Sequence, residues 1–187
     1  MGVRRLVDGP GIVLVAGRAL KKGDVLTTGN LGRRSDFERL SVRARQLLVP
    51  AKALRVTPGP QRDLFDEAAQ KSFEMSVYRV TEESNRMGLR LSGTMIHASA
   101  SGEMISEGVA LGAVQMPESG MPIILFVEQQ TTGGYPKIAN VISADFHSLG
   151  QLRPRDEIRF EMVTWEVARA LYREQEEVLA SEELLFA

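Results

Sequence analysis

The sequence contains no cysteine, which excludes disulfide bonds, thiolate zinc sites and cysteine nucleophiles. Any chemistry must therefore come from oxygen and nitrogen groups. An excess of positive charge is also missing, because 23 Lys and Arg residues stand against 24 Asp and Glu residues. Dedicated nucleic-acid-binding proteins normally carry such an excess. We therefore expect a cytoplasmic protein that binds no nucleic acid.

Long hydrophobic runs are absent as well. No segment approaches the roughly 20 apolar residues that cross a bilayer, and the apolar stretch at residues 12–16 is too short for a secretion signal. The 187 residues are 43% hydrophobic and 25% charged, which is typical of a globular protein with a sizeable core. We expect a soluble protein that contacts no membrane.

Short apolar segments separated by glycine and proline recur along the chain and indicate β-strands. Residues 157–162 alternate strictly between polar and apolar side chains, and residues 122–127 form an apolar run. Pro117 and Gly120 favour a hairpin turn before this run. The same criteria predict strands at residues 12–16, 25–26, 54–56, 77–80, 89–91, 94–97, 109–116 and 138–142.

Two segments have helical spacing instead. Residues 63–75 place apolar side chains such as Phe65 and Phe73 on one face, and a second amphipathic segment follows Thr164, a suitable N-cap. Many short strands with two helices predict a mainly-β fold, a closed or nearly closed barrel with one internal helix and a C-terminal helix. The order of segments does not fit a parallel α/β protein.

The loop at residues 130–137 is the strongest candidate for a ligand site. It joins two predicted strands, and Gly133 and Gly134 can adopt positive φ and leave backbone amides uncovered. Its polar groups could converge on a carboxylate, a ureido group or a phosphate. The alternative is a tight turn with a solvated lysine. The candidate residues are Gln130, Thr131, Thr132, Gly133, Gly134, Tyr135 and Lys137.

Other polar residues have more ordinary interpretations beside their functional ones. We interpret Gln115 as a strand residue that faces water, Glu107 as the end of a loop, and Arg86 as a solvated arginine, with a place in a binding site as the alternative for each. His97 and His147 have no acidic neighbours at metal-ligand spacing, and neither forms a triad, so we predict no metal site.

Six motifs follow one another along the chain. They are Pro58-Gly59-Pro60-Gln61, Ser84-Asn85-Arg86-Met87-Gly88, Ser106-Glu107-Gly108-Val109, Gly112-Ala113-Val114-Gln115-Met116-Pro117, Gln130 through Lys137, and Val141-Ile142-Ser143-Ala144-Asp145. With these motifs in this order, the chain resembles allophanate hydrolase subunit 2-like proteins from Gly9 to Met162. This family is also known as the biotin-dependent carboxyltransferase family, as the C subunit of 5-oxoprolinase and as the antagonist of the sporulation kinase inhibitor.

The resemblance implies a cyclophilin-like β-barrel whose motif loops gather at one cleft. That cleft would bind a small amide or lactam, or carboxybiotin, and Glu128 stands where relatives usually carry aspartate. The implied roles are an anion site at Arg86 and Lys137, hydrogen bonds from Gln115, Gln130, Thr131, Thr132, Gly133 and Gly134, a wall at Tyr135, and catalysis by Lys137 with Glu107 or Glu128.

The family works with a B-like subunit, which is similar to allophanate hydrolase subunit 1, and, in 5-oxoproline opening, with an A-type partner as well. The resemblance therefore implies an oligomer in which a partner binds ATP, while this chain alone binds no cofactor. Whether the chain is an enzyme stays open. The alternatives are a regulatory binding module that catalyses nothing and, by fold analogy alone, a peptidyl-prolyl isomerase.

Family members also have a related N-terminal half, and residues 17–26 match the middle of the usual protein. We therefore expect a fragment, a split-gene product or a shortened descendant. The predicted organisation is a remnant with a linker at residues 1–50, the barrel at 51–163 and the C-terminal helix at 164–187.

Overall fold

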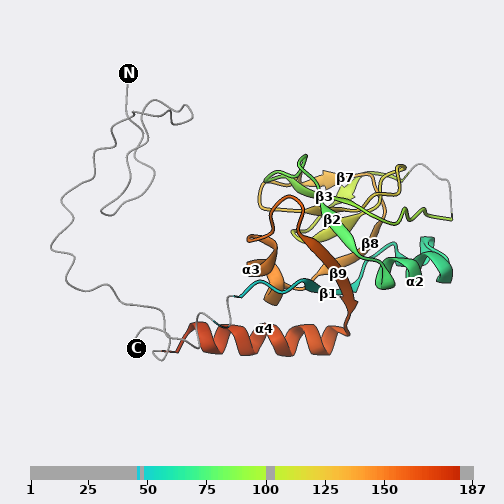
Figure 1. Ribbon diagram of the computed structural model, residues 1–187. Coiled ribbons are helices and arrows are strands. Elements are labelled where there is room, and N and C mark those ends of the chain that lie inside the picture. Colours follow the sequence, from blue (N-terminus) through green and yellow to red (C-terminus); the bar gives the residue numbers. More distant parts are fainter. Residues whose placement is uncertain (1–45, 47–48, 100–103, 182–187) are drawn as a thin grey trace, which may run out of the picture. The chain divides into compact units, whose positions relative to one another are not determined.

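Strands β1 to β3, β5, β6, β8 and β9 close into a barrel in the computed structural model, which describes residues 46, 49–99 and 104–181 (Figure 1). The order around the barrel is β1-β8-β5-β6-β3-β2-β9. Neighbouring strands are antiparallel, except that β9 and β1 are parallel. The strands are β1 (Ala53–Pro58), β2 (Tyr78–Val80), β3 (Gly88–Ser92), β5 (Ala113–Gln115), β6 (Ile123–Leu125), β8 (Lys137–Val141) and β9 (Glu157–Met162).

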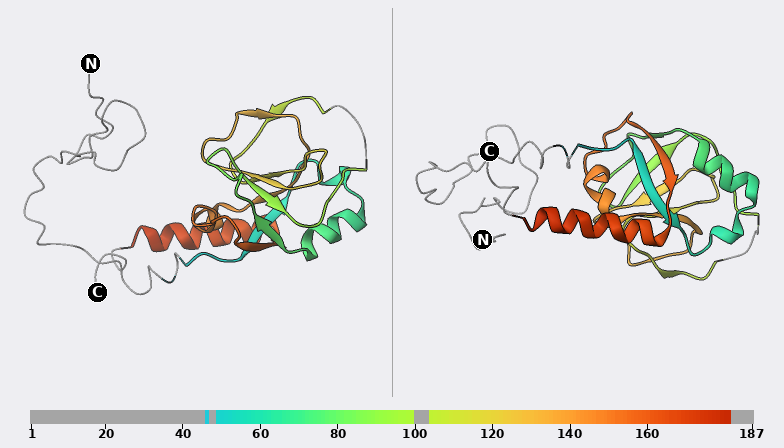
Figure 2. Two further views of the ribbon diagram at one scale, coloured as in Figure 1. Left: turned by 45° about the horizontal axis from the view of Figure 1, so that its top comes forward. Right: turned by 90° about the horizontal axis from the view of Figure 1, so that it is seen from below.

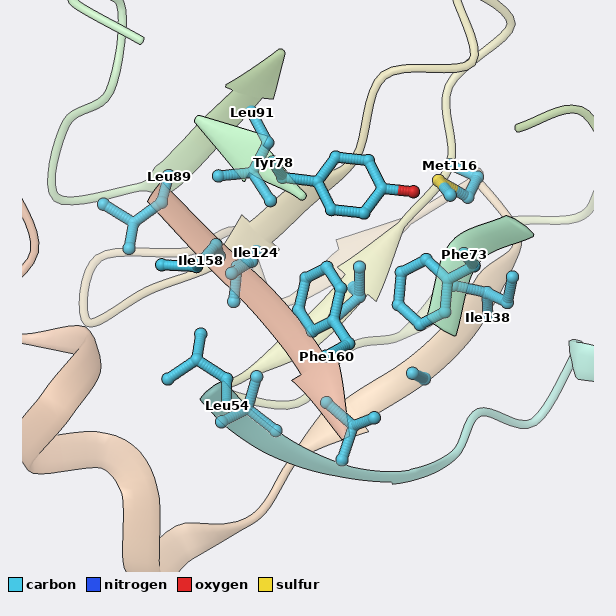
Figure 3. Close-up of a cluster of buried hydrophobic side chains, with 14 of the residues drawn as sticks. Leu54, Phe73, Tyr78, Leu89, Leu91, Met116, Ile124, Ile138, Ile158 and Phe160 are labelled. Atoms are coloured by element: carbon cyan, nitrogen blue, oxygen red, sulfur yellow. The ribbon is translucent and has the colours of Figure 1, made fainter. Parts of the chain in front are cut away.

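Alternation in β9 explains how the barrel fills its interior. Ile158 and Phe160 are buried, whereas the charged residues that alternate with them, Glu157, Arg159 and Glu161, are exposed. The ring of Phe160 stacks on Phe73 with ring centroids 4.5 Å apart, and Tyr78 packs against both (Figure 3). The predicted mainly-β barrel is confirmed. The strands predicted at residues 12–16 and 25–26 lie outside the described residues.

The helices also follow from local sequence. Helix α2 (Glu67–Met75) begins later than the predicted residue 63, because residues 62–64 form a 3₁₀ turn, η1 (Arg62–Leu64). Asp66 then adopts an extended conformation and accepts a 2.7 Å hydrogen bond from the backbone N–H of Ala69. Helix α4 (Trp165–Leu179) begins after Thr164, whose hydroxyl accepts from the N–H of Val167, as predicted.

A buried carboxylate holds the segment between β8 and β9 to the barrel. This segment contains the short η2 (Ser143–Asp145) and α3 (Phe146–Leu149), which the sequence did not predict. Asp145, with a side chain 1% exposed, forms an ion pair with the Arg55 guanidinium and accepts a 2.7 Å hydrogen bond from the Arg55 N–H. Helix α4 packs against η2 and β1, along the outside of the barrel (Figures 1 and 2).

Two predicted strands differ from the structure. Residues 94–97 are irregular, because the N–H of Ile96 donates to the Gly120 carbonyl of the hairpin turn instead of joining a strand ladder. The strand predicted at 109–116 is reduced to β5, since Gly112 has a φ of 82° and interrupts the extended chain. In the described part of the chain, no helix is long and apolar enough to span a bilayer.

Candidate functional site

The predicted ligand loop crosses the end of the barrel. It leaves β6 and enters β8, and β5 lies between these two strands. On the way it forms β7 (Thr132–Gly133), which pairs with β4 (Glu107–Gly108) in a separate small sheet. Glu107 is the register partner of Gly133. This pairing brings Glu107 to the start of β8, where Lys137 lies.

Lys137 is a buried cation. Its side chain is only 3% exposed, and its Nζ lies 2.5 Å from Oε1 of Glu107, which is 45% exposed. Apart from this ion pair, the ammonium has no hydrogen-bond partner among the described residues. Removing an ammonium from water is costly unless it is paired and hydrogen-bonded. A cation in this state is therefore a candidate for ligand binding.

Gln61 fixes the geometry of this ion pair. Its Nε2 donates to Oε1 of Glu107 over 2.6 Å, and its Oε1 accepts from the backbone N–H of Lys137 over 3.2 Å. Gly59 lets the chain pass close enough for these contacts, because a Cβ at this position would lie 2.2 Å from the Lys137 carbonyl oxygen. One carboxamide thus holds both the carboxylate and the lysine backbone.

A β-bulge between β5 and β8 buries a second polar side chain. Val114 pairs with Ala139 but Gln115 pairs with Lys137, so the ladder skips Ile138. Gln115 is 2% exposed, and within the part of the chain that the structure describes its Nε2 has no hydrogen-bond partner. It lies against Gly133, where a Cβ would be 2.5 Å from this nitrogen.

We name Gln61, Glu107, Gln115, Gly133 and Lys137 the Lys137 cluster. Its one carboxylate is already engaged, whereas two buried donor groups, an ammonium and an amide, have unused hydrogen-bonding capacity. An unpaired buried donor costs about 1–3 kcal/mol. A ligand with oxygen acceptors, such as a carboxylate or a carbonyl, would remove this cost.

A groove of about 620 Å³ adjoins the cluster and is lined mainly by apolar atoms. One wall is formed by α4 and the other by β8 and the chain around β1. Its volume lies in the range of about 300–1,000 Å³ that small-molecule sites occupy. The residues that line it include Thr57, Gly108, Lys137, Trp165, Arg169 and Tyr172.

Comparison with known proteins agrees with this architecture. The family model described as carboxyltransferase domain, subdomain A and B, matches residues 9–162, which is most of the chain. The chain belongs to this carboxyltransferase-domain family. The barrel, the bulge and the Lys137 cluster all lie within the matched residues.

Similar proteins include 5-oxoprolinase C subunits and urea amidolyases. The 5-oxoprolinase C subunit of Escherichia coli is 37% identical over 89% of this chain and 52% of its own length. The urea amidolyase of Saccharomyces cerevisiae is 28% identical over 88% of this chain and 10% of its own length. The crystal structure of the K. lactis urea amidolyase matches 76% of this chain and 10% of its own with a TM-score of 0.67 and 28% identity. The chain spans about half the length of the E. coli protein.

In this carboxyltransferase-domain chain, several predicted site residues meet. Lys137, Glu107, Gln115 and Gly133 belong to the cluster, and the Gln130 amide also lies beside Gly133. The interpretation of Gln115 as a water-facing strand residue is wrong, because the bulge and Gly133 bury it. Glu107 does end a loop, but it also carries the ion pair.

Other predicted residues lie apart from the cluster. Arg86 pairs with Glu128 over 2.7 Å, and both side chains are more than half exposed, so each neutralises the other in solvent. The predicted positive φ at Gly133 and Gly134 is wrong; β7 keeps Gly133 extended, and glycine is needed there for space. Thr131, Thr132, Gly134 and Tyr135 are exposed.

Sequence reasoning missed the role of Gln61 and the α4 wall of the groove. Gln61 belongs to one of the six motifs, but its partners lie 46 and 76 residues away along the chain. The signal for the groove was the only tryptophan of the chain, Trp165, at the start of an amphipathic helix and 63% exposed.

The ion pair makes a prediction about pH. Lys137, and then Gln61, lower the pKa of Glu107 below its ordinary value of 4.5. Because the folded-state pKa is lowered, this stabilisation is complete above pH 4.5 and is lost as the pH falls through the lowered pKa. In Lys137→Met we expect the pKa of Glu107 to rise toward 4.5 in a carboxyl-carbon NMR titration.

Glu157 provides the internal control for this titration. Its pKa is lowered by Arg79, on another part of the surface, and Lys137→Met should leave it unchanged. An unchanged pKa for Glu107 in the same spectra would mean that the Lys137 contact does not form in solution.

Proposed function

We propose that the chain is the substrate-binding component of an ATP-dependent 5-oxoprolinase assembly. The observation that carries this proposal is a pair of buried donors with unused hydrogen-bonding capacity, Lys137 Nζ and Gln115 Nε2, at one cluster. The 37% identity to the 5-oxoprolinase C subunit of E. coli, against 28% to the S. cerevisiae urea amidolyase, favours a lactam over urea.

The lactam 5-oxoproline matches the donors of the cluster. Its carboxylate is the natural partner of the Lys137 ammonium, and its ring carbonyl can accept from Gln115. The exposed hydroxyls of Thr131 and Thr132 lie on the same loop and can close over the bound ring. The chain thus binds and orients the lactam, whereas ATP acts on a partner of the A or B type.

Glu107 is suited to binding rather than to proton transfer near neutral pH. An efficient general base has a pKa near the working pH, whereas the pKa of Glu107 is lowered by Lys137. Its ionised carboxylate keeps the ammonium in place and can accept the lactam N–H. We therefore assign the bond-breaking groups to a partner protein of the assembly.

The cluster also fits the ureido and carboxylate oxygens of carboxybiotin, because both present acceptors to buried donors. When bound, carboxybiotin would supply an activated carboxyl group, and Lys137 and Gln115 would hold its oxygens. This is the corresponding proposal for a carboxyltransferase of the urea carboxylase type.

The engagement of Glu107 by Lys137 also favours a second candidate, a regulatory module that binds without catalysis. Co-production of the chain with homologues of the A and B partners distinguishes the 5-oxoprolinase component from the regulatory module. For the 5-oxoprolinase component, we expect ATP-dependent conversion of 5-oxoproline into glutamate. Ligand binding without turnover in the complete assembly would favour the regulatory module.

Removal of the ammonium is expected to weaken binding without unfolding the protein. Lys137→Met keeps the side-chain volume, and we expect it to cost about 1.5–3 kcal/mol of binding free energy for 5-oxoproline, the range for a hydrogen bond to a charged group. Calorimetric titration measures the binding free energy, and thermal melts show whether the variant stays folded.

The matched control is Lys71→Met on the exposed face of α2. It makes the same chemical change on an element outside the Lys137 cluster and should leave the affinity for 5-oxoproline unchanged. Equal affinities for the parent, Lys137→Met and Lys71→Met would reduce the loop to a structural connection.

A further inference from the structure

The α4 groove has features that a compact lactam does not use. Trp165 and Tyr172 stand two helical turns apart on α4, are 63% and 43% exposed, and both line the groove. Aromatic side chains on a groove wall offer large contact area to an apolar ligand at low conformational cost. A ligand the size of 5-oxoproline would fill only a small part of about 620 Å³.

The charges at the groove have one sign. Lys137 and Arg169 line it, and among the described residues no carboxylate belongs to its lining. The Arg169 side chain has no ion pair or hydrogen bond with residues 49–99 and 104–181. Glu107 compensates Lys137, so within these residues Arg169 is the uncompensated cation on the wall. An anion is therefore the ligand that this groove favours.

We propose that the groove binds the apolar body of a ligand whose carboxylate or carbonyl end is held by Lys137. This deepens the proposed function and rests on its assignment of Lys137 as the anion-binding group. The groove then also accepts organic acids or amides whose apolar ring body is larger than the five-membered lactam of 5-oxoproline. Trp165 and Tyr172 contact the apolar body of the ligand, and Arg169 attracts its negative charge.

Trp165 allows a direct test, because it is the chain's only tryptophan and every change in tryptophan emission reports on the groove. The probes are adamantane-1-carboxylate, which absorbs no near-ultraviolet light, adamantan-1-amine with the same body and opposite charge, and acetate. We expect adamantane-1-carboxylate to shift the emission saturably and to bind at least about tenfold more tightly than either control probe.

Two substitutions on the same helix provide a matched comparison. Tyr172→Ala removes part of the groove wall. It should lower the affinity for adamantane-1-carboxylate about tenfold, because aromatic contact area is lost. Leu179→Ala removes a similarly exposed side chain that does not line the groove, and should have no effect. Lys137→Met should lower the affinity for adamantane-1-carboxylate but leave the lower affinity for adamantan-1-amine unchanged.

The outcomes separate this inference from the proposed function. Lys137-dependent binding of 5-oxoproline without any change in Trp165 emission for the adamantane probe would overturn the groove inference alone. Failure of every tested anion, including 5-oxoproline, to bind would overturn both the groove inference and the proposed function. Emission that changes on dilution of the protein without ligand would mean that a second copy covers the groove, which also contradicts the inference.

Discussion

Gly59→Ala is expected to lower the free energy of unfolding by about 3 kcal/mol or more, the upper end for overpacking a close contact. The added Cβ would lie 2.2 Å from the Lys137 carbonyl oxygen and 2.6 Å from the Ala139 nitrogen. Both are backbone atoms of β8, so no side chain can move aside. Urea unfolding followed by circular dichroism measures the change.

Gly108→Ala is the matched control, because a Cβ there meets nothing within 4 Å. It should change stability by no more than about 0.5 kcal/mol, as an unstrained surface substitution does. Similar midpoints for the two variants would mean that β1 and β8 do not approach as described. The close approach also positions Gln61 against Lys137, so Gly59→Ala should abolish ligand binding as well.

Asp145→Ala is the second large effect, with an expected loss of about 2–4 kcal/mol for a buried ion pair and a lost backbone acceptor. The Asp145 carboxylate holds both the guanidinium and the N–H of Arg55, and its hydrogen bond raises the pKa of that guanidinium. Its removal detaches η2, against which α4 packs. The groove should therefore open as the barrel loses stability.

Glu157→Ala is the comparison for this variant. Glu157 pairs with Arg79 in an ion pair whose two side chains are both more than half exposed. Such pairs contribute about 0–1 kcal/mol. Equal losses for Asp145→Ala and Glu157→Ala in urea unfolding would show that burial of Asp145 adds nothing.

Local pattern was sufficient for most of the barrel. Strict alternation predicted β9 with its observed bounds, because one face of that strand packs on Phe73 and the other meets solvent. Thr164 was recognisable as an N-cap, since the interaction spans only three residues. Features decided within a few residues of the chain are visible in its sequence.

The polar interior of the site was not predictable in the same way. Gln115 is buried because a bulge shifts the β5–β8 ladder and because Gly133, from the crossing loop, covers it. Neither the β-bulge nor the packing of Gly133 against Gln115 can be recognised from residues 113–115. A glutamine at a strand end without this packing would face water, which is why the sequence pattern predicted a solvent-facing side chain.

Distance along the chain also explains why Arg86 lies apart from the cluster. Its motif offered an anion site as the alternative to a solvated arginine, and strand pairing of β3 with β6 places it beside Glu128, its 2.7 Å ion-pair partner. The groove depended on how α4 docks on β1 and η2, which tertiary contacts decide. The motifs contain Gln61, Gln115 and Lys137, but only packing brings these three residues together.

The side-chain amide signals of Gln115 in a proton–nitrogen NMR spectrum provide the decisive measurement. If this buried, unpaired amide and the Lys137 ammonium bind the oxygens of one ligand, both groups must respond to the same titration. Addition of 5-oxoproline should shift both amide proton signals saturably in the parent protein and in Lys71→Met, and far less in Lys137→Met. Signals that stay in place in the parent while 5-oxoproline binds by calorimetry would place the ligand elsewhere and contradict the proposed role of the Lys137 cluster.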